Sequence, residues 1–125
     1  MPEDFTNPDL SRRHKGHVIE QLAESWLSER GLTLIERNFT LKGGEIDLIM
    51  WQDDVLVFIE VRYRATNEHG SGAESITRSK IHKLLRTAEY YLQKNFGNNP
   101  PFCRFDVLSG QGEPIEFEWI KNAFA

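Results

Sequence analysis

The stretch that decides the fold spans residues 45–64 and reads EIDLIMWQDDVLVFIEVRYR. Two segments rich in β-branched and aromatic residues flank the polar pair Asp53 and Asp54, a pattern that predicts a β-hairpin. If these two residues form the loop, Gln52 pairs with Val55, and this pairing sets the register along both strands.

In this register Asp47 stands directly opposite Glu60, with the Cβ atoms about 4.5–5.5 Å apart on one face of the sheet. Strict alternation places Ile46, Leu48 and Met50 together on the other face. Directly opposed like charges destabilise a sheet. The two carboxylates therefore need a shared proton, a basic partner or a divalent cation.

Two interpretations of this carboxylate pair remain open from the residues alone. In the first, Asp47 and Glu60 belong to a structural ion-pair ladder with Arg62 and a lysine. In the second, they form a site for a hard metal ion with carbonyl and water oxygens, which suits Mg²⁺ or Mn²⁺.

Hydrophobic periodicity predicts the elements before this hairpin. Apolar residues at helical spacing predict a helix over 15–30 that ends at Gly31. The polar stretch 1–14 is expected to be a flexible N-terminal tail. A strand is expected over 32–39.

A second helix is expected after the hairpin, beginning at a cap on Ser75 or Thr77 and ending near Gly97. The intervening loop 65–74 is rich in glycine and polar residues. Two more strands are expected over 102–108 and 115–120. The order α-β-β-β-α-β-β predicts an α/β fold with one mixed sheet flanked by helices, in a single domain over 15–125.

Composition narrows the class of protein. The chain has 125 residues, of which 39% are hydrophobic, and no apolar run approaches the length of a membrane span. The N-terminus has no apolar core typical of a secretory signal. The single cysteine, Cys103, cannot form an internal disulfide. We therefore expect a cytoplasmic protein without membrane partners.

Charge is distributed unevenly along the chain. The net charge is −4, yet residues 62–86 hold six basic and two acidic side chains. A basic segment in an acidic protein is compatible with a nucleic-acid-binding surface. It is equally compatible with a solvated helix face.

The sequence resembles a known family through several short motifs in a fixed order. Asp47, followed after the hairpin by Glu60-Val61-Arg62, resembles the PD-(D/E)xK nuclease signature, and the element order resembles the restriction-endonuclease-like fold. The chain is similar to small bacterial proteins of the YraN type, an uncharacterised family related to archaeal Holliday-junction resolvases. The motifs that carry this second resemblance are Gly16-x-x-x-Glu20-x-x-Ala23, Asn38-Phe39, Gly44–Ile49, Phe58–Arg64, Lys80 and Arg104–Val107.

The resemblance implies a metal-dependent endonuclease that acts on DNA. Asp47 and Glu60 would be metal ligands, with the Val61 carbonyl as a third and the first-helix Glu20 nearby. A solvated helix residue is the alternative for Glu20. The cofactor implied is Mg²⁺ or Mn²⁺.

One position departs from the family pattern, because Arg62 stands where the signature has lysine. Arginine carries charge and binds phosphate through two N–H groups, but it does not give up a proton at neutral pH. Lys80, near the start of the second helix, is the candidate to replace that lysine. Either Arg62 and Lys80 share the catalytic role, or the site binds without catalysis.

The expected ligand is branched or flapped DNA, since a chain this short has little surface for reading bases. Contacts to the phosphate backbone are expected from the 65–74 loop and from basic side chains, which position a strand without reading its sequence. These side chains are Arg64, Arg78, Lys83 and Arg86. The last strand could pair two copies into a homodimer or be an ordinary strand with one exposed face.

Overall fold

The computed structural model describes the backbone of residues 8–64 and 76–124, and the side chains of this part from residue 16 onward. The expected order of elements is confirmed. The elements are α1 (Pro8–Ser28), β1 (Thr33–Leu41), β2 (Gly44–Gln52), β3 (Val55–Arg64), α2 (Arg78–Phe96), β4 (Phe102–Gln111) and β5 (Glu116–Ile120). The expected loop over 65–74 lies outside the described residues.

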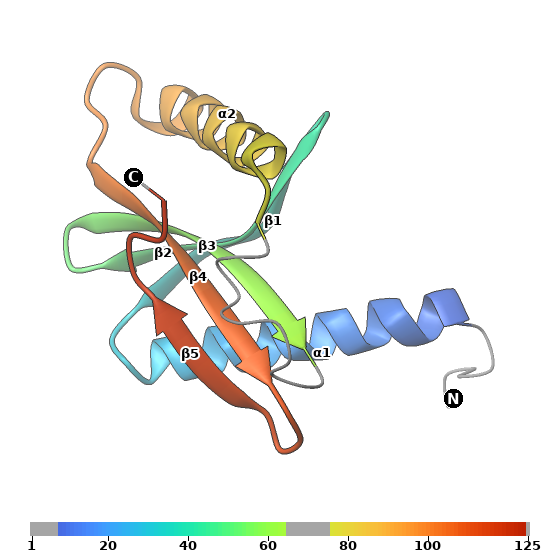
Figure 1. Ribbon diagram of the computed structural model, residues 1–125. Coiled ribbons are helices and arrows are strands. Elements are labelled where there is room, and N and C mark those ends of the chain that lie inside the picture. Colours follow the sequence, from blue (N-terminus) through green and yellow to red (C-terminus); the bar gives the residue numbers. More distant parts are fainter. Residues whose placement is uncertain (1–7, 65–75, 125) are drawn as a thin grey trace.

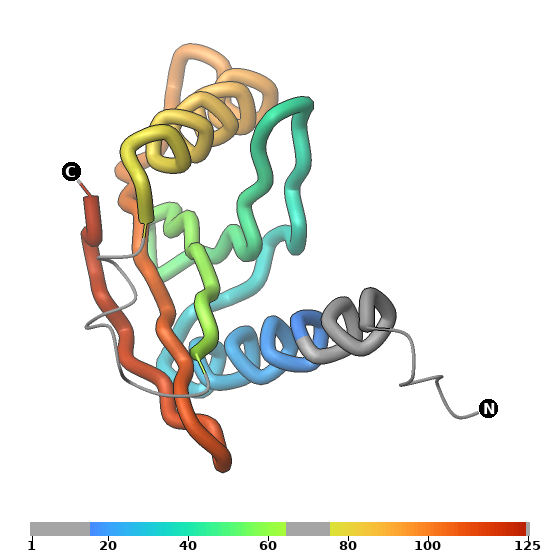
Figure 2. Tube along the Cα trace, turned by 45° about the vertical axis from the view of Figure 1, so that its right-hand side comes forward, coloured from blue at the N-terminus to red at the C-terminus, as the bar shows by residue number. Residues whose placement is uncertain are grey.

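The five strands form one mixed sheet in the order β1-β2-β3-β4-β5. β3 and β4 run parallel and are joined through α2, whereas the other neighbouring pairs are antiparallel. The two helices lie on opposite sides of the sheet (Figures 1 and 2). The fold is therefore a mixed α/β layer structure, as the periodicity predicts.

Each face of the sheet has its own hydrophobic core. On the α2 side, Phe39, Ile49 and Phe58 pack against Leu84 and Tyr91 of the helix. On the α1 side, Ala23 and Leu27 of the helix pack against apolar side chains of the sheet. The strands in the middle of the sheet are apolar on both faces, so a polar side chain there stands out as an exception.

The hairpin register follows the prediction from Gln52–Val55 as far as Leu48–Ile59. The ladder stops one pair short of Asp47 and Glu60, so the expectation that these two face each other as a ladder pair is corrected. On the other side of β2, the register steps from Arg37–Leu48 to Phe39–Ile46 and skips Asn38 and Asp47. Asn38 has φ +51°, which breaks the extended backbone there.

This interruption also changes the face on which Ile46 lies. Ile46 packs with Ile49 on the α2 side, while Leu48 and Met50 pack on the α1 side. Grouping Ile46 with Leu48 and Met50 from strict alternation is therefore wrong. The reason is that Asp47 lies at an irregularity, on either side of which the alternation has a different phase.

Helix α1 begins at Pro8, whereas periodicity places its start near Lys15. Residues 8–14 are thus helical, and this part of the expected tail is corrected. Residues 1–7 lie outside the described part. Proline is well tolerated in the first turn of a helix, so Pro8 is compatible with a helix that begins there.

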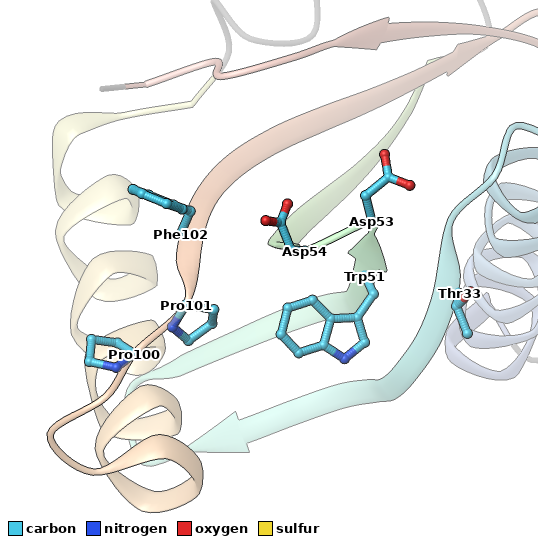
Figure 3. Close-up of a pocket in the computed structure, with 7 residues that line it drawn as sticks. All are labelled: Thr33, Trp51, Asp53, Asp54, Pro100, Pro101 and Phe102. Atoms are coloured by element: carbon cyan, nitrogen blue, oxygen red, sulfur yellow. The ribbon is translucent and has the colours of Figure 1, made fainter.

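A hollow of the described surface lies at the turn end of the β2–β3 hairpin. It has a volume of about 750 Å³, and its lining is Thr33, Trp51, Asp53, Asp54, Pro100, Pro101 and Phe102 (Figure 3). Trp51 also packs edge-on against Phe96 of α2, with ring centroids 6.1 Å apart. This hollow contains none of the predicted site residues. Neither of the two helices, as far as the structure describes them, is long and apolar enough to cross a membrane.

Candidate carboxylate and lysine site

A small cavity lies between the first turns of α2 and the start of β2. Its volume is about 130 Å³, and it is lined by Gly43, Gly44, Glu45, Asp47, Glu60, Lys80, Lys83 and Leu84. Gly44 is needed for this close approach, because a Cβ there would meet the Thr87 hydroxyl and the Lys83 carbonyl. The cavity brings together Asp47, Glu60 and Lys80, three residues selected from the sequence.

Glu60 is the most buried acid of this cavity. It follows the apolar run of β3, and only 6% of its side chain is exposed. Lys80 Nζ lies 2.6 Å from Glu60 Oε1, and Arg62 Nε lies 3.9 Å from the same oxygen. Thr77 caps α2 by accepting a hydrogen bond from the Lys80 N–H, which fixes the helical turn that carries the lysine.

Asp47 is half-buried and sits beside Glu60 without a cationic partner of its own among the described side chains. Its Oδ2 accepts a hydrogen bond from the Val61 N–H at 2.8 Å. Burial, followed by the negative charge of Glu60, raises the pKa of Asp47 to about 8, although the Val61 hydrogen bond acts in the opposite direction. Asp47 therefore has no cation of its own among the described side chains, whereas Glu60 has Lys80 and Arg62.

Glu20 approaches the same region from α1. Burial raises the pKa of Glu20, and the charges of Glu45 and Glu60 act in the same direction. With its nitrogen turned toward the acids, the Asn38 amide donates to Glu45 Oε1 at 2.9 Å and to Glu20 Oε1 at 3.1 Å. Glu20 is thus half-buried and tied to β1 and β2 rather than freely solvated.

The chemistry of these side chains fits a small, hard cation. Asp47 and Glu60 supply carboxylate oxygens in a confined space, and the raised pKa of Asp47 shows that its ionised form is unfavourable there without a further cation. Within the described residues, no three acidic, histidine or cysteine side chains are close enough to form a complete ligand set. Glu20 therefore contributes charge from a greater distance than Asp47 and Glu60.

The basic residues selected from the sequence occupy different places. Lys83 lines the cavity, whereas Arg78 and Arg86 are exposed on α2. Arg64 is half-buried near the end of β3. The Nε of Arg62 and the Nη1 of Arg64 are buried and lack a hydrogen-bond partner in the structure.

Two contributors to the site were missed by sequence reasoning. Glu45 and Asn38 were considered only as parts of the motifs that carry the resemblance. The signal for Asn38 was present in principle, because asparagine is among the few residues that tolerate positive φ in a strand. An irregularity opposite Asp47 could have been inferred from it.

Comparison with known proteins shows the family to which this chain belongs. The sequence model of the Uncharacterised protein family UPF0102 matches residues 19–109. A UPF0102 protein of Aeromonas hydrophila is 46% identical over 125 residues, covering 99% of this chain and 95% of the relative. One of Nitrosomonas europaea is 47% identical over 116 residues (91% and 96%), and the UPF0102 protein YraN of Salmonella newport is 46% identical over 116 residues (92% and 87%). The matched segment contains every residue of the cavity.

Proposed function

We propose that this chain, which belongs to the Uncharacterised protein family UPF0102, binds DNA at the cavity and hydrolyses its phosphodiester bonds in the presence of Mg²⁺ or Mn²⁺. The observation that carries the proposal is the pair Asp47 and Glu60, two acids confined together with Lys80 as the close cation. The resemblance to the restriction-endonuclease-like fold and to Holliday-junction resolvases supports branched or flapped DNA as the substrate.

Asp47 and Glu60, with the Val61 carbonyl, would hold the metal ion, which lowers the pKa of bound water and stabilises charge on a phosphate oxygen. The Val61 N–H fixes the Asp47 carboxylate through the 2.8 Å hydrogen bond. Burial of Glu60 excludes water from one side of the pair and strengthens its electrostatic interactions.

Lys80 and Arg62 are proposed to stabilise negative charge in the transition state. Lys80 Nζ contacts Glu60 directly, which supports Lys80 as the replacement for the lysine that the signature places at position 62. We expect Lys80→Ala to lower turnover more than affinity. Arg62→Lys, which restores the signature, should keep or raise turnover. A silent Lys80→Ala together with an inactive Arg62→Ala would instead assign the role to Arg62 alone.

Binding is proposed to use basic residues of α2 and of the end of β3, namely Arg64, Arg78, Lys83 and Arg86. Exchanging Lys83 and Arg86 for alanine should weaken DNA binding. It should also reduce the slope of the logarithm of the binding constant against the logarithm of the salt concentration by up to about 0.9 for each phosphate contact that is lost. An unchanged slope would place the binding surface elsewhere. A two-fold dimer through the edge strand β5 would suit a two-fold symmetric junction.

A second function is a nuclease fold that binds DNA or a partner protein without cleaving. Two observations favour it: Arg62 replaces the lysine, and the Lys80–Glu60 ion pair already engages one oxygen of the proposed metal ligand. Turnover separates the two functions.

The test is a cleavage assay with Mn²⁺ and with Mg²⁺ on branched, flapped, single-stranded and duplex DNA. We expect cleavage of a branched or flapped substrate that is lost in Glu60→Gln, a variant of nearly the same size without the charge. Binding without cleavage by the wild type would support the second function. Cleavage that survives in Glu60→Gln would come from a contaminant or another site. If the wild type binds none of the DNA substrates, the proposal that the protein acts on nucleic acid is wrong.

A further inference from the structure

The end of β3 carries two arginines beyond the carboxylates. Glu60, Arg62 and Arg64 occupy alternate positions and therefore point to the same face of the strand, the face that also bears Phe58 under α2. The ladder to β2 ends at Ile59, whereas pairing with β4 continues to Arg64. The last residues of β3 thus extend past the N-terminal end of α2 (Figure 1).

Among the described side chains, Arg62 and Arg64 have fewer partners than Arg104, which is also partly buried; Arg62 has only the 3.9 Å ion pair with Glu60. Arg104 is bound by Asp106 and Gln52. By contrast, Arg62 Nε and Arg64 Nη1 are buried without a hydrogen-bond acceptor, and no ion pair of Arg64 occurs among the described residues. A partly dehydrated guanidinium without an acceptor is costly, and an anion would relieve that cost.

We propose that Arg62 and Arg64 bind two consecutive phosphates of one nucleic-acid strand, which then follows the last residues of β3 away from the carboxylates. This inference rests on the proposed function. Arg62, close to Glu60, takes the phosphate at the cavity, and Arg64 takes the next one along the strand.

The spacing of the two arginines fits this ligand better than two unrelated anions. Residues two apart on a strand are separated by about 6.5–7 Å, which is comparable with the distance between neighbouring phosphates in an extended nucleic-acid strand. Guanidinium groups bind phosphate through paired N–H groups, so both contacts can form without reading a base.

The test uses two small probes that differ in one phosphate, thymidine 5′-monophosphate and thymidine 3′,5′-bisphosphate. Their affinities for the full chain are measured by NMR titration in Mg²⁺. The wild type should bind the bisphosphate about tenfold more tightly, which is the size expected of one charge-assisted contact. Arg64→Ala should bind the monophosphate like the wild type and lose the preference, whereas Arg62→Ala should weaken binding of both probes.

The matched control is Arg37→Ala, because Arg37 is an exposed arginine that already pairs with Glu24 at 2.6 Å. It should keep the full preference for the bisphosphate. The melting temperature of Arg64→Ala should equal or exceed that of the wild type, since no described contact uses its charge. A lower melting temperature would indicate a structural role and overturn the inference.

Failure of the inference can be told apart from failure of the proposed function. A preference that persists in Arg64→Ala, or a wild type without preference that still binds branched DNA, overturns the consecutive-phosphate site alone. A wild type that binds neither the probes nor branched DNA overturns both.

Discussion

Two acids of this sheet, one on β4 and one on β2, differ in how many hydrogen-bond donors surround them. Asp106 on β4 is fully buried, and donors surround it: the Arg104 guanidinium, the Trp119 indole N–H at 2.8 Å and the Asn122 N–H at 2.9 Å. Asp47, two strands away, has the single Val61 N–H and a second acid beside it.

This difference distinguishes a structural acid from a candidate functional one. The donors around Asp106 come from β4, β5 and the segment after β5, so the carboxylate ties the C-terminal part of the chain to the sheet. Asp47 accepts one hydrogen bond and has no cation of its own among the described side chains, although Glu60 beside it pairs with Lys80. A buried acid whose oxygens already accept several hydrogen bonds cannot also bind a ligand. An acid that accepts a single hydrogen bond still has oxygen lone pairs free to bind one.

The largest expected effect follows from removing the saturated acid. Asp106→Ala leaves the Arg104 charge and the Trp119 N–H without their acceptor, and we expect a loss of about 3–5 kcal/mol in the free energy of unfolding. Urea denaturation measures this loss. The control is Glu24→Ala, which breaks the exposed pair with Arg37 and should cost less than about 1 kcal/mol. Equal effects of the two variants would contradict the structural role of Asp106.

The next effect concerns the binding of a metal ion by Asp47 and Glu60 and can be measured without a substrate. Mn²⁺ at a hundredfold excess over its dissociation constant should stabilise the wild type by about 2.7 kcal/mol. Glu60→Gln should lose most of this gain, because one ligand charge is removed. Melting curves with chelator and with Mn²⁺ measure both quantities.

The control for this metal effect is Asp53→Asn, which removes an acid at the far end of the hairpin. Asp53 has φ +53°, a conformation that asparagine tolerates, so the exchange should not disturb the turn. Asp53→Asn should respond to Mn²⁺ as the wild type does. A wild type that is indifferent to Mn²⁺ would favour purely structural carboxylates.

The sequence predicted the parts of the molecule that local patterns control. Element order follows from periodicity, and the hairpin register follows from the two-residue turn at Asp53 and Asp54. Lys80 was selected for its place near the start of α2, and its contact with Glu60 is in the structure.

The features that the sequence did not predict depend on contacts between segments that are far apart in the chain. The irregularity at Asp47 needs the positive φ of Asn38 on another strand, and Ile46 changes faces as a consequence. The partners of Asp106 come from residues 104, 119 and 122 and from a tertiary arrangement that no periodicity encodes. An acid in an apolar strand therefore indicates burial, but its sequence neighbourhood does not tell whether donors saturate it.

The last effect tests, in chelator, the cost of ionising Asp47, which arises first from burial and second from the charge of Glu60. The pKa of Asp47 is raised in the folded state to about 8, whereas the unfolded chain releases this proton near the ordinary value. Between these two values the folded state holds a proton that the unfolded state has lost, so raising the pH favours unfolding. The contribution of Asp47 to stability should therefore fall as the pH rises from about 4 to about 8 and change little above that range.

Asp47→Asn cannot ionise and should lack this contribution to the pH dependence. At pH 8 the variant should be more stable than the wild type by at least about 0.5–1 kcal/mol, the usual size of a like-charge effect between neighbouring strands, to which the cost of burying the charge adds. Toward pH 4 the difference should shrink, because the wild-type acid is then protonated as well. A structural ion pair gives the opposite sign, since asparagine would leave a basic partner without its counter-charge at pH 8. Melting temperatures of both proteins across this pH range therefore decide whether Asp47 is a satisfied acid like Asp106 or an acid that lacks a cation.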